Sequence, residues 1–247
     1  MKSLLRLTVV EMKLYLREPM ATFFTLIYAP MLLVLFGFIY GNDPTPLFGG
    51  RGFIDAMIPA YTALIIVTVG LMSVPISTAE DREKGILRRF FSTPTSPAVY
   101  LFSNIFVYYI MALLGVIILF LVGVFAYNIK FEGNIFSVFI AFTLSALSFF
   151  SFGYLIASLA PTARTAQVIG MVIAFPMMFL SGATIPIEFL GDRVANITKY
   201  VPLYYVVTLM KGLWAGQSWS EHWLNIVVLL GLLIVGAAVS VKTFRWE

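Results

Sequence analysis

Six charge-free apolar windows constrain the fold of this chain more than any other feature. They cover residues 19–42, 56–79, 90–129, 133–163, 165–187 and 222–241. A helix needs about 20 apolar residues to cross the hydrocarbon core of a bilayer, and each mid-span charge costs roughly 2.5–3.5 kcal/mol. Only 11% of the residues are charged and the mean hydropathy is +0.95, so the apolar surface of the chain needs lipid. The sequence therefore predicts an integral membrane protein.

The windows reduce to six transmembrane helices in a single all-α domain over residues 1–247. The window at 90–129 is too long for one straight span, and its start, 90–97, contains Pro94 and Pro97 among serines and threonines, which break helices. The expected spans are 20–41, 56–79, 100–127, 135–160, 165–187 and 222–241. Two longer connections remain, a charged loop at 80–97 and a segment at 188–221.

The distribution of Lys and Arg predicts the orientation. If the N-terminus is cytoplasmic, 11 of the 16 Lys and Arg residues lie on the inner side and five on the outer side. The positive-inside rule then places both termini in the cytoplasm. The net charge of +4 could suggest nucleic acid, but the positive charge gathers at the ends of apolar windows, where topology uses it. The first apolar run starts only at Met20 and is too long for a signal core, so we expect it to stay attached.

Residues 1–18 are predicted to form an amphipathic interfacial helix. At 100° per residue, the basic side chains of Lys2, Arg6, Lys13 and Arg17 fall within about 60° of one another. Apolar residues, Tyr15 among them, occupy the other side. This pattern is typical of a helix that lies in the cytoplasmic leaflet, although a simple positive topology anchor is also compatible with it.

The segment between the fifth and sixth spans is too apolar for a plain exposed loop and too short and charged to cross. Gly182 and Pro186 lead the chain out of the fifth span, and 197–214 is an apolar helix that we expect Pro202 to break. A re-entrant or outer-leaflet hairpin fits, provided that protein covers the broken backbone. A folded extracellular cap is the alternative.

The sequence offers no catalytic chemistry. It has no Walker A motif or zinc-ligand spacing, no cysteine and a single histidine, His222. Asp55 is a lone carboxylate, and Arg164 marks a short cytoplasmic turn. The spans hold no mid-span charge for ion coupling. Small and hydroxyl residues on the fourth span, from Ser145 to Ser158, favour close helix packing over a hydrophilic pore.

The densest charge lies between the second and third spans, where 80–89 holds seven of the 28 charged residues. The spacing of Glu80 and Asp81 to Lys84 supports a helix that continues the second span. Gly85 permits a sharp change of direction, and a short amphipathic piece at 86–91 ends before Pro94. We interpret this segment as a protrusion that sits in water against another protein.

The order of these features resembles the type-2 permeases of ATP-binding cassette (ABC) transporters, in the antibiotic and multidrug exporter branch. The segment 79–87 with Pro94 is similar to the acidic-Arg-Glu-x-Gly-x-Leu loop of that family. The stretches 181–186, 201–205 and 212–213 resemble its region between spans five and six. The N-terminal helix followed by 17–19 resembles its entry into the first span.

The resemblance implies a permease without catalytic or metal-binding residues, paired with a second permease copy and with two ATP-binding subunits that use ATP and Mg. Its site residues would fall into three groups. The ATPase-coupling residues would be Glu80, Asp81, Arg82, Glu83, Gly85, Ile86, Leu87, Arg88, Arg89 and Pro94. The outer gate would comprise Gly182, Pro186, Glu188, Pro202, Tyr204 and Tyr205, and the interfacial helix would use Arg6, Lys13 and Arg17.

The expected function is export of hydrophobic or amphipathic compounds across the inner membrane of a prokaryote, by alternating access or squeezing between permease copies. Spans one, two and five would face the central cavity. Three alternatives stay open: a permease for polysaccharide or glycolipid export, a self-contained carrier or channel, and a non-transporting member of a sensing or resistance complex.

Overall fold

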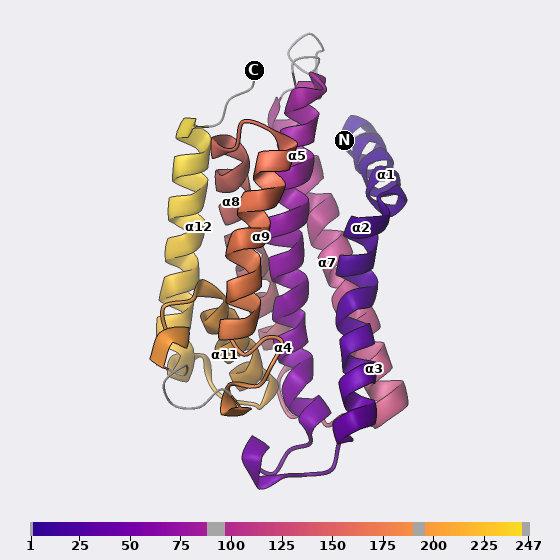
Figure 1. Ribbon diagram of the computed structural model, residues 1–247, viewed down its shortest axis with the longest axis vertical. Coiled ribbons are helices and arrows are strands. Elements are labelled where there is room, and N and C mark those ends of the chain that lie inside the picture. The colour runs from indigo at the N-terminus through magenta and orange to yellow at the C-terminus, as the bar shows by residue number, and fades with distance from the viewer. Residues whose placement is uncertain (1, 88–96, 190–195, 244–247) are drawn as a thin grey trace.

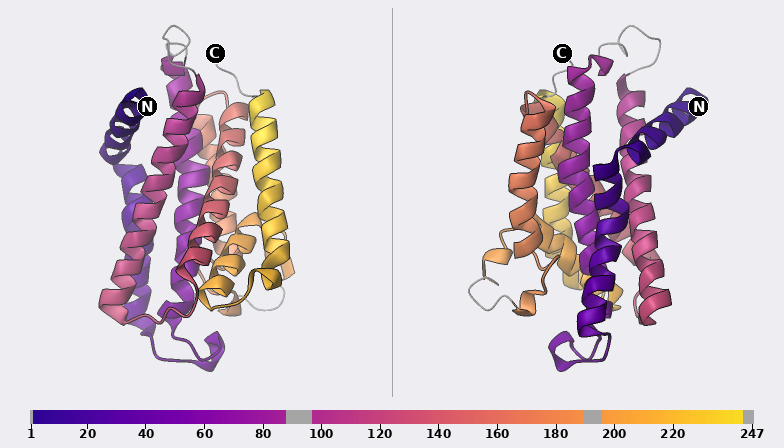
Figure 2. Two further views of the ribbon diagram at one scale, coloured as in Figure 1. Left: turned by 180° about the vertical axis from the view of Figure 1, so that it is seen from behind. Right: turned by 45° about the vertical axis from the view of Figure 1, so that its right-hand side comes forward.

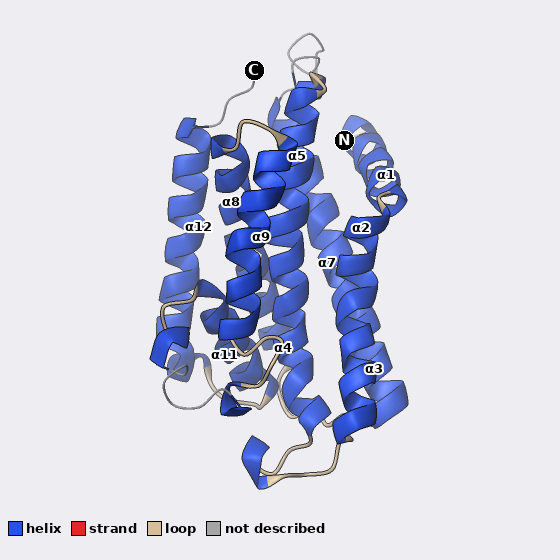
Figure 3. Ribbon diagram, viewed as in Figure 1, coloured by secondary structure: helices blue, strands red, loops and turns tan. Residues whose placement is uncertain are grey.

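The computed structural model describes residues 2–87, 97–189 and 196–243, and it shows an elongated bundle of helices (Figure 1). Within these residues every regular element is helical, apart from one isolated β-bridge between Thr45 and Arg51. In Figure 3, which is coloured by secondary structure, the described residues are drawn as helices and loops. The predicted all-α class is therefore confirmed.

Among the described residues, six helices are long and apolar enough to cross a membrane, as predicted. The first is Pro19–Tyr40, built from α2 (Pro19–Thr22), the π-helical η1 (Phe23–Ile27) and α3 (Tyr28–Tyr40). The second is Phe53–Glu83, built from α4 (Phe53–Thr68), the π-helical η3 (Val69–Ser73) and α5 (Val74–Glu83). The others are Tyr100–Tyr127 within α7 (Pro97–Tyr127), α8 (Ile135–Leu159), α9 (Ala163–Leu180), and Trp219–Thr243, which joins η5 (Trp219–His222) to α12 (Trp223–Thr243).

The second span forms the centre of the bundle. It runs the length of the molecule, with α1 (Lys2–Arg17), α3 and α7 on one side and α8, α9, α11 (Pro202–Trp214) and α12 on the other (Figures 1 and 2). Of the residues in its most apolar window, 89% are buried, against 22–50% for the other spans. We call its α5 end, with residues 84–87, the charged end of the bundle. The opposite end, with residues 41–52 and α11, is the loop end.

Glycines allow the neighbouring helices to approach the backbone of η3. A Cβ atom on Gly153 of α8 would lie 2.0 Å from the carbonyl oxygen of Gly70, and one on Gly170 of α9 would lie 2.2 Å from that of Leu71. Small residues are the usual means of close helix contact in membranes. The central helix is therefore held by backbone contacts at the point where its hydrogen bonding changes to the π pattern.

Hydroxyl groups join α8 to α12. The Ser148 hydroxyl donates to the carbonyl oxygen of Leu229 over 2.8 Å, and that of Ser151 donates to Leu232 over 3.3 Å. The hydroxyls of Ser158 and Thr243 lie 2.7 Å apart. The interpretation of these serines as packing residues is confirmed, since they bind a neighbouring helix.

The fifth span ends at Leu180, so its predicted end at residue 187 was wrong. Ser181 closes the last turn by donating its N–H to the carbonyl oxygen of Met177, and Gly182 then adopts a left-handed φ of 80°. A glycine in this conformation is a common helix terminator because it carries no Cβ. The chain continues into a short turn, η4 (Ile187–Phe189), instead of a further helical turn.

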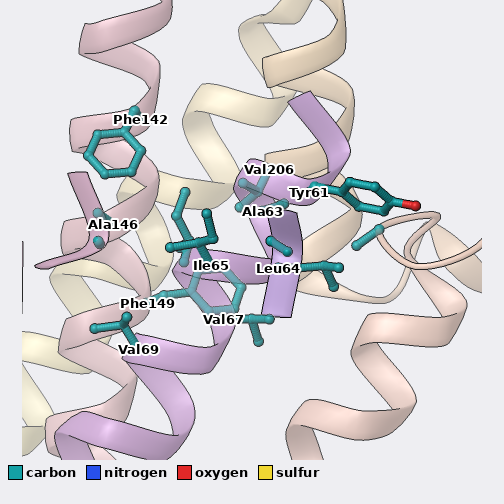
Figure 4. Packing of buried hydrophobic residues seen from close by; sticks show 14 of the residues in the cluster. Tyr61, Ala63, Leu64, Ile65, Val67, Val69, Phe142, Ala146, Phe149 and Val206 are labelled. Atoms are coloured by element: carbon teal, nitrogen blue, oxygen red, sulfur yellow. The ribbon is translucent and has the colours of Figure 1, made fainter. Parts of the chain in front are cut away.

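The predicted break in the apolar helix at 197–214 is confirmed: a helical turn at 196–198 ends, residues 199–201 are non-helical, and Pro202 then begins α11. It occupies the first turn, where a missing N–H is tolerated, and the helix then runs unbroken to Trp214. Thirteen residues span about 20 Å, less than the roughly 30 Å hydrocarbon core. The buried face of α11 packs on α4, where Val206 lies beside Ala63 while Phe149 of α8 lies beside Ile65 (Figure 4). The re-entrant placement of this segment stays a prediction.

The predicted N-terminal helix is present as α1, which leaves the bundle at an angle at the charged end (Figure 2). Tyr15 anchors it: the side chain is buried, and its hydroxyl lies 2.6 Å from that of Thr25 in η1 and 3.3 Å from that of Ser73 in η3. Lys13 and Arg17 are exposed, as an interfacial helix requires. The side chain of Arg6 lies outside the described part of the structure.

The glycine contacts give a direct test of the central packing. We expect Gly153→Ala to lower the stability of the protein by about 1–3 kcal/mol, because the new methyl group overlaps a backbone carbonyl that cannot retreat. Gly231→Ala is the matched control, since a Cβ there meets nothing within 4 Å. Thermal unfolding of both variants in detergent measures the difference, and equal midpoints would contradict the packing described here.

Candidate functional site

The charged segment is helical up to Glu83 and then turns sharply. Glu80 and Lys84 form an exposed ion pair of 2.7 Å at the predicted i,i+4 spacing. The helix closes with bonds from the N–H groups of Lys84 and Gly85, and Gly85 has a left-handed φ of 67°. Leu87 is buried directly after the turn. The remaining predicted coupling residues, Arg88, Arg89 and Pro94, lie outside the described residues.

Asp81 joins this segment to α7. Its carboxylate accepts a hydrogen bond from the hydroxyl of Tyr100, near the start of α7. Tyr100 is only 1% exposed, so the bond is shielded from water. A charged acceptor strengthens a hydrogen bond, and shielding strengthens it further.

Arg82 joins the same segment to α8. Its guanidinium donates to the carbonyl oxygen of Ala157 over 3.0 Å and also to that of Ala160, the residue that caps α8. The last carbonyl groups of a helix lack partners within the helix and carry partial negative charge. Arg82 satisfies two acceptors at this point and neutralises the end of α8.

Glu83 joins the segment to α9. Its carboxylate accepts the backbone N–H of Ala163, the first residue of α9, over 3.0 Å. Thr162 caps the same helix through the N–H of Thr165. A carboxylate at a helix N-terminus is favoured by the helix dipole. Three successive charged residues thus bind three different helices, and we call Asp81, Arg82 and Glu83 the anchor triplet.

The anchor triplet changes the interpretation of the predicted coupling residues. The family resemblance implied that all of them contact a partner, and that role stays a prediction. In the structure, the three side chains of the triplet are bonded within the chain, and Glu83 also stays exposed. Lys84 is exposed as well, and Glu80 and Ile86 are partly exposed. No sequence motif pointed to the carbonyl groups of α8 or the first N–H of α9 as partners, because backbone acceptors leave no trace in residue identity.

Glu11 of α1 was not among the predicted site residues, yet its environment is unusual. Burial, together with the nearby negative charge of Asp81, raises the pKa of its carboxyl from an ordinary value of about 4.5 to about 7. The pKa of Glu18 is also raised, first by burial and then by Glu80. Glu11 of α1 and Glu18, which follows α1, therefore lie near carboxylates of α5, and their repulsion weakens as protons bind.

At the loop end, Asp55 is held by hydrogen bonds from two loops. It is 4% exposed and accepts the backbone N–H of Lys130 over 2.9 Å and the side-chain amide of Asn42 over 3.3 Å. Arg51 pairs with Glu132 at 2.7 Å and donates to the carbonyl oxygen of Ala215. These bonds connect the loops after the first and third spans with the end of α11.

The predicted outer-gate residues gather only in part. Glu188 and Lys211 of α11 form a long ion pair of 4.0 Å. Tyr204 and Tyr205 pack edge to face, and the Tyr205 hydroxyl donates to the carbonyl oxygen of Lys199. Gly182 is required where it stands, since a Cβ there would lie 2.5 Å from the Ile187 side chain and its φ is positive. Pro186 precedes η4, and Pro202 starts α11.

The six-span helical bundle with a buried central helix and one dense charged end is that of an integral membrane protein, and comparison with known proteins identifies the family. The profile of the ABC-2 family transporter proteins matches residues 41–242. This range covers most of the chain, which therefore belongs to the ABC-2 transporter family.

The chain is similar to two proteins of Escherichia coli K12 named as probable multidrug ABC transporter permeases. It is 26% identical to YbhR over 178 residues, which cover 70% of this chain and 48% of that protein. It is 22% identical to YbhS over 192 residues, or 77% of this chain and 50% of that protein. The chain thus spans about half the length of these relatives. It is also 26% identical over 209 residues to the putative transport permease ycf38 of Cyanophora paradoxa, covering 82% and 71% of the two chains.

The anchor triplet predicts that neighbouring charged residues differ in how much they contribute to the stability of the protein. We expect Arg82→Ala to destabilise the protein by about 1.5–3 kcal/mol, because two helix-end carbonyls lose a charged donor. Glu80→Ala is the matched control and should cost no more than about 0.5 kcal/mol, because its ion pair is exposed. Thermal unfolding in detergent measures both, and a Glu80 variant as unstable as the Arg82 variant would contradict the assignment.

Glu11 predicts a pH dependence with a defined sign. Since its pKa is higher in the folded protein than in the unfolded chain, the folded state holds more protons between about pH 4.5 and 7, and stability falls as pH rises through this window. Glu11→Gln should therefore be more stable than the native protein at pH 8 and equal to it at pH 4. Thermal midpoints at several pH values test this, with exposed Asp43→Asn as the control. An unchanged pH profile in the Glu11 variant would refute it.

Proposed function

We propose that the chain is the transmembrane permease subunit of an ATP-driven exporter of hydrophobic or amphipathic compounds, such as a drug, an antibiotic or a lipid-like molecule. The observation that carries this proposal is the anchor triplet. A force applied at the charged end reaches α7, α8 and α9 at once through Asp81, Arg82 and Glu83. A chain without catalytic residues needs such a connection to use work supplied from outside.

In the proposed mechanism, the ATP-binding subunits press on the exposed surface around Glu80, Lys84 and Ile86. The central helix acts as the lever, since it is continuous from Phe53 to Glu83 and buried for most of its length. Closure of the ATPase would tilt the spans between inward-facing and outward-facing states. This chain binds no cofactor in the proposal, and the partner subunits use ATP and Mg.

The proposed substrate class follows from the side chains that would line a substrate path between the spans. The predicted spans carry no Asp, Glu, Lys or Arg. Aromatic and aliphatic side chains and hydroxyl groups must therefore form the path, and these favour apolar cargo. The word multidrug in the names of the two Escherichia coli relatives supports the same class.

The proposed assembly has two permease copies and two ATP-binding subunits in the inner membrane of a prokaryote. Both termini would be cytoplasmic, because the Lys and Arg residues are more numerous on that side. The charged end would then face the ATPase, and the loop end, with Glu188, Tyr204 and Tyr205, would form the outer gate.

The proposal is tested by co-purification of the tagged chain with candidate ATP-binding subunits, followed by ATPase assays in liposomes. We expect a stable complex in which Gly85→Ala uncouples hydrolysis from transport, because a non-glycine residue at φ 67° costs about 1–2 kcal/mol and redirects the chain. Gly231→Ala is the control and should leave both activities unchanged.

A chain that purifies alone and moves solute without ATP would contradict the proposal and favour a carrier or channel. A complex that exports polysaccharide or glycolipid, but no small apolar compound, would contradict the proposed substrate class alone.

A further inference from the structure

An apolar pocket of about 310 Å³ lies between α7, α8 and α12, a size at the lower end of small-molecule sites. Its apolar wall is formed by Leu101 and Ile105 of α7, Leu147 and Phe150 of α8, and Leu233 and Ala237 of α12. Only three hydroxyl-bearing side chains, those of Ser151, Tyr154 and Ser240, complete the polar part of its lining.

The pocket exists because α12 is bonded closely to α8, whereas α7 packs mainly on other helices. The serine bonds to Leu229 and Leu232 draw α12 close to α8, and Gly236 lies against Ser151, where a Cβ would lie 2.6 Å from its hydroxyl oxygen. In contrast, α7 packs mainly on α1, α3 and α4. The seam between α7 and the α8–α12 pair therefore stays open.

The pocket opens sideways toward the surroundings of the bundle. Val241 forms part of its lining and is 81% exposed, and Ala237 is also exposed. All three lining helices are long and apolar enough to span a membrane, so we expect the medium at this opening to be lipid. A hydrocarbon chain is the group that such a wall accommodates best.

One buried polar group points to a ligand that is more than a plain hydrocarbon. Tyr154 is 7% exposed, and its hydroxyl has no hydrogen-bond partner among the described residues. An unpaired buried donor costs about 1–3 kcal/mol, which a ligand with an acceptor group would recover. The neighbouring Ser151 hydroxyl, by contrast, is already bonded within the protein.

We propose that this pocket binds a single-chain amphiphile from the membrane, with its hydrocarbon tail against Leu101, Phe150 and Ala237 and an acceptor group at the Tyr154 hydroxyl. Binding of the amphiphile does not depend on the proposed function. Only the interpretation of this amphiphile as transported cargo rests on the proposed function. The site lies toward the charged end, because Leu101 is near the start of α7 and Val241 near the end of α12. In the predicted orientation it opens to the inner leaflet.

The test is photolabelling of the purified full chain in vesicles of phosphatidylethanolamine and phosphatidylglycerol. One probe is a fatty acid with a diazirine in its chain, and the other is a phospholipid that carries the same chain. Peptide mapping should place the fatty-acid label on the segments that line the pocket, around residues 101–105, 147–154 and 233–241. No ATP-binding subunit is needed, so this result is independent of complex formation.

A matched pair of variants on α12 decides the outcome. Ala237→Phe fills the pocket and should reduce labelling by about tenfold, whereas Ala238→Phe, an exposed neighbour outside the lining, should not. Tyr154→Phe should reduce fatty-acid labelling by about two- to tenfold, the value of one hydrogen bond. If Ala237→Phe does not fold, Leu101→Trp fills the same space from α7.

Equal labelling of the Ala237 and Ala238 variants would overturn the site. Pocket labelling by the phospholipid probe alone would overturn the single-chain amphiphile and make the pocket a site for membrane lipid. A chain that fails to bind any ATP-binding subunit, but still shows fatty-acid labelling that depends on Ala237, would refute the proposed function and leave the site intact.

Discussion

The structure depends on how the end of its central helix is fixed. The second span is buried along most of its length, so its side chains cannot move without moving the helices around it. At its charged end, hydrophobic packing gives way to three directed polar bonds, from Asp81 to α7, from Arg82 to α8 and from Glu83 to α9. Each bond involves a charged group, and two of them also satisfy helix ends. Together they make the last turn of α5 part of the surrounding bundle.

The same helix has its least regular segment about three turns away from this end. The π-helical η3 receives the close backbone contacts of Gly153 and Gly170 and lies beside the anchor of α1 at Tyr15. π-Bulges often occur at functional sites, because they change the direction of side chains without ending a helix. The central helix is thus fixed at its end and tightly packed at its irregular segment. Because of both features, a force on the charged end would move the surrounding helices and would not only deform the central helix.

Much of the fold follows from the sequence, because the membrane restricts the choices. Charge-free windows predicted six spans, and the basic periodicity predicted α1, since lipid permits few alternatives to a helix of sufficient length. The error lies where the chain leaves a membrane-spanning helix. The sequence extended the fifth span beyond Leu180, because apolar composition alone does not mark a helix end.

The site was less predictable for a related reason. The spacing of Glu80 to Lys84 and the presence of Gly85 indicated a helix and a turn, and both are observed. However, the partners of Arg82 and Glu83 are backbone groups of α8 and α9, which any residue could supply. The pocket beside Tyr154 likewise depends on the separation of α7 from the α8–α12 pair, a distance that no local pattern encodes.

Since Arg82 and Glu83 bond to α8 and α9, we infer that the charged end moves as one unit with the turn between these two helices. The chain contains no cysteine, so spin labels can be introduced at two chosen positions without background. We would label Lys84→Cys and Arg164→Cys, both exposed, and measure their separation in the complex with and without trapped ATP. The account predicts the same distance distribution in both states. A separation that changes with the nucleotide would contradict it and would show that the anchor triplet opens during the cycle.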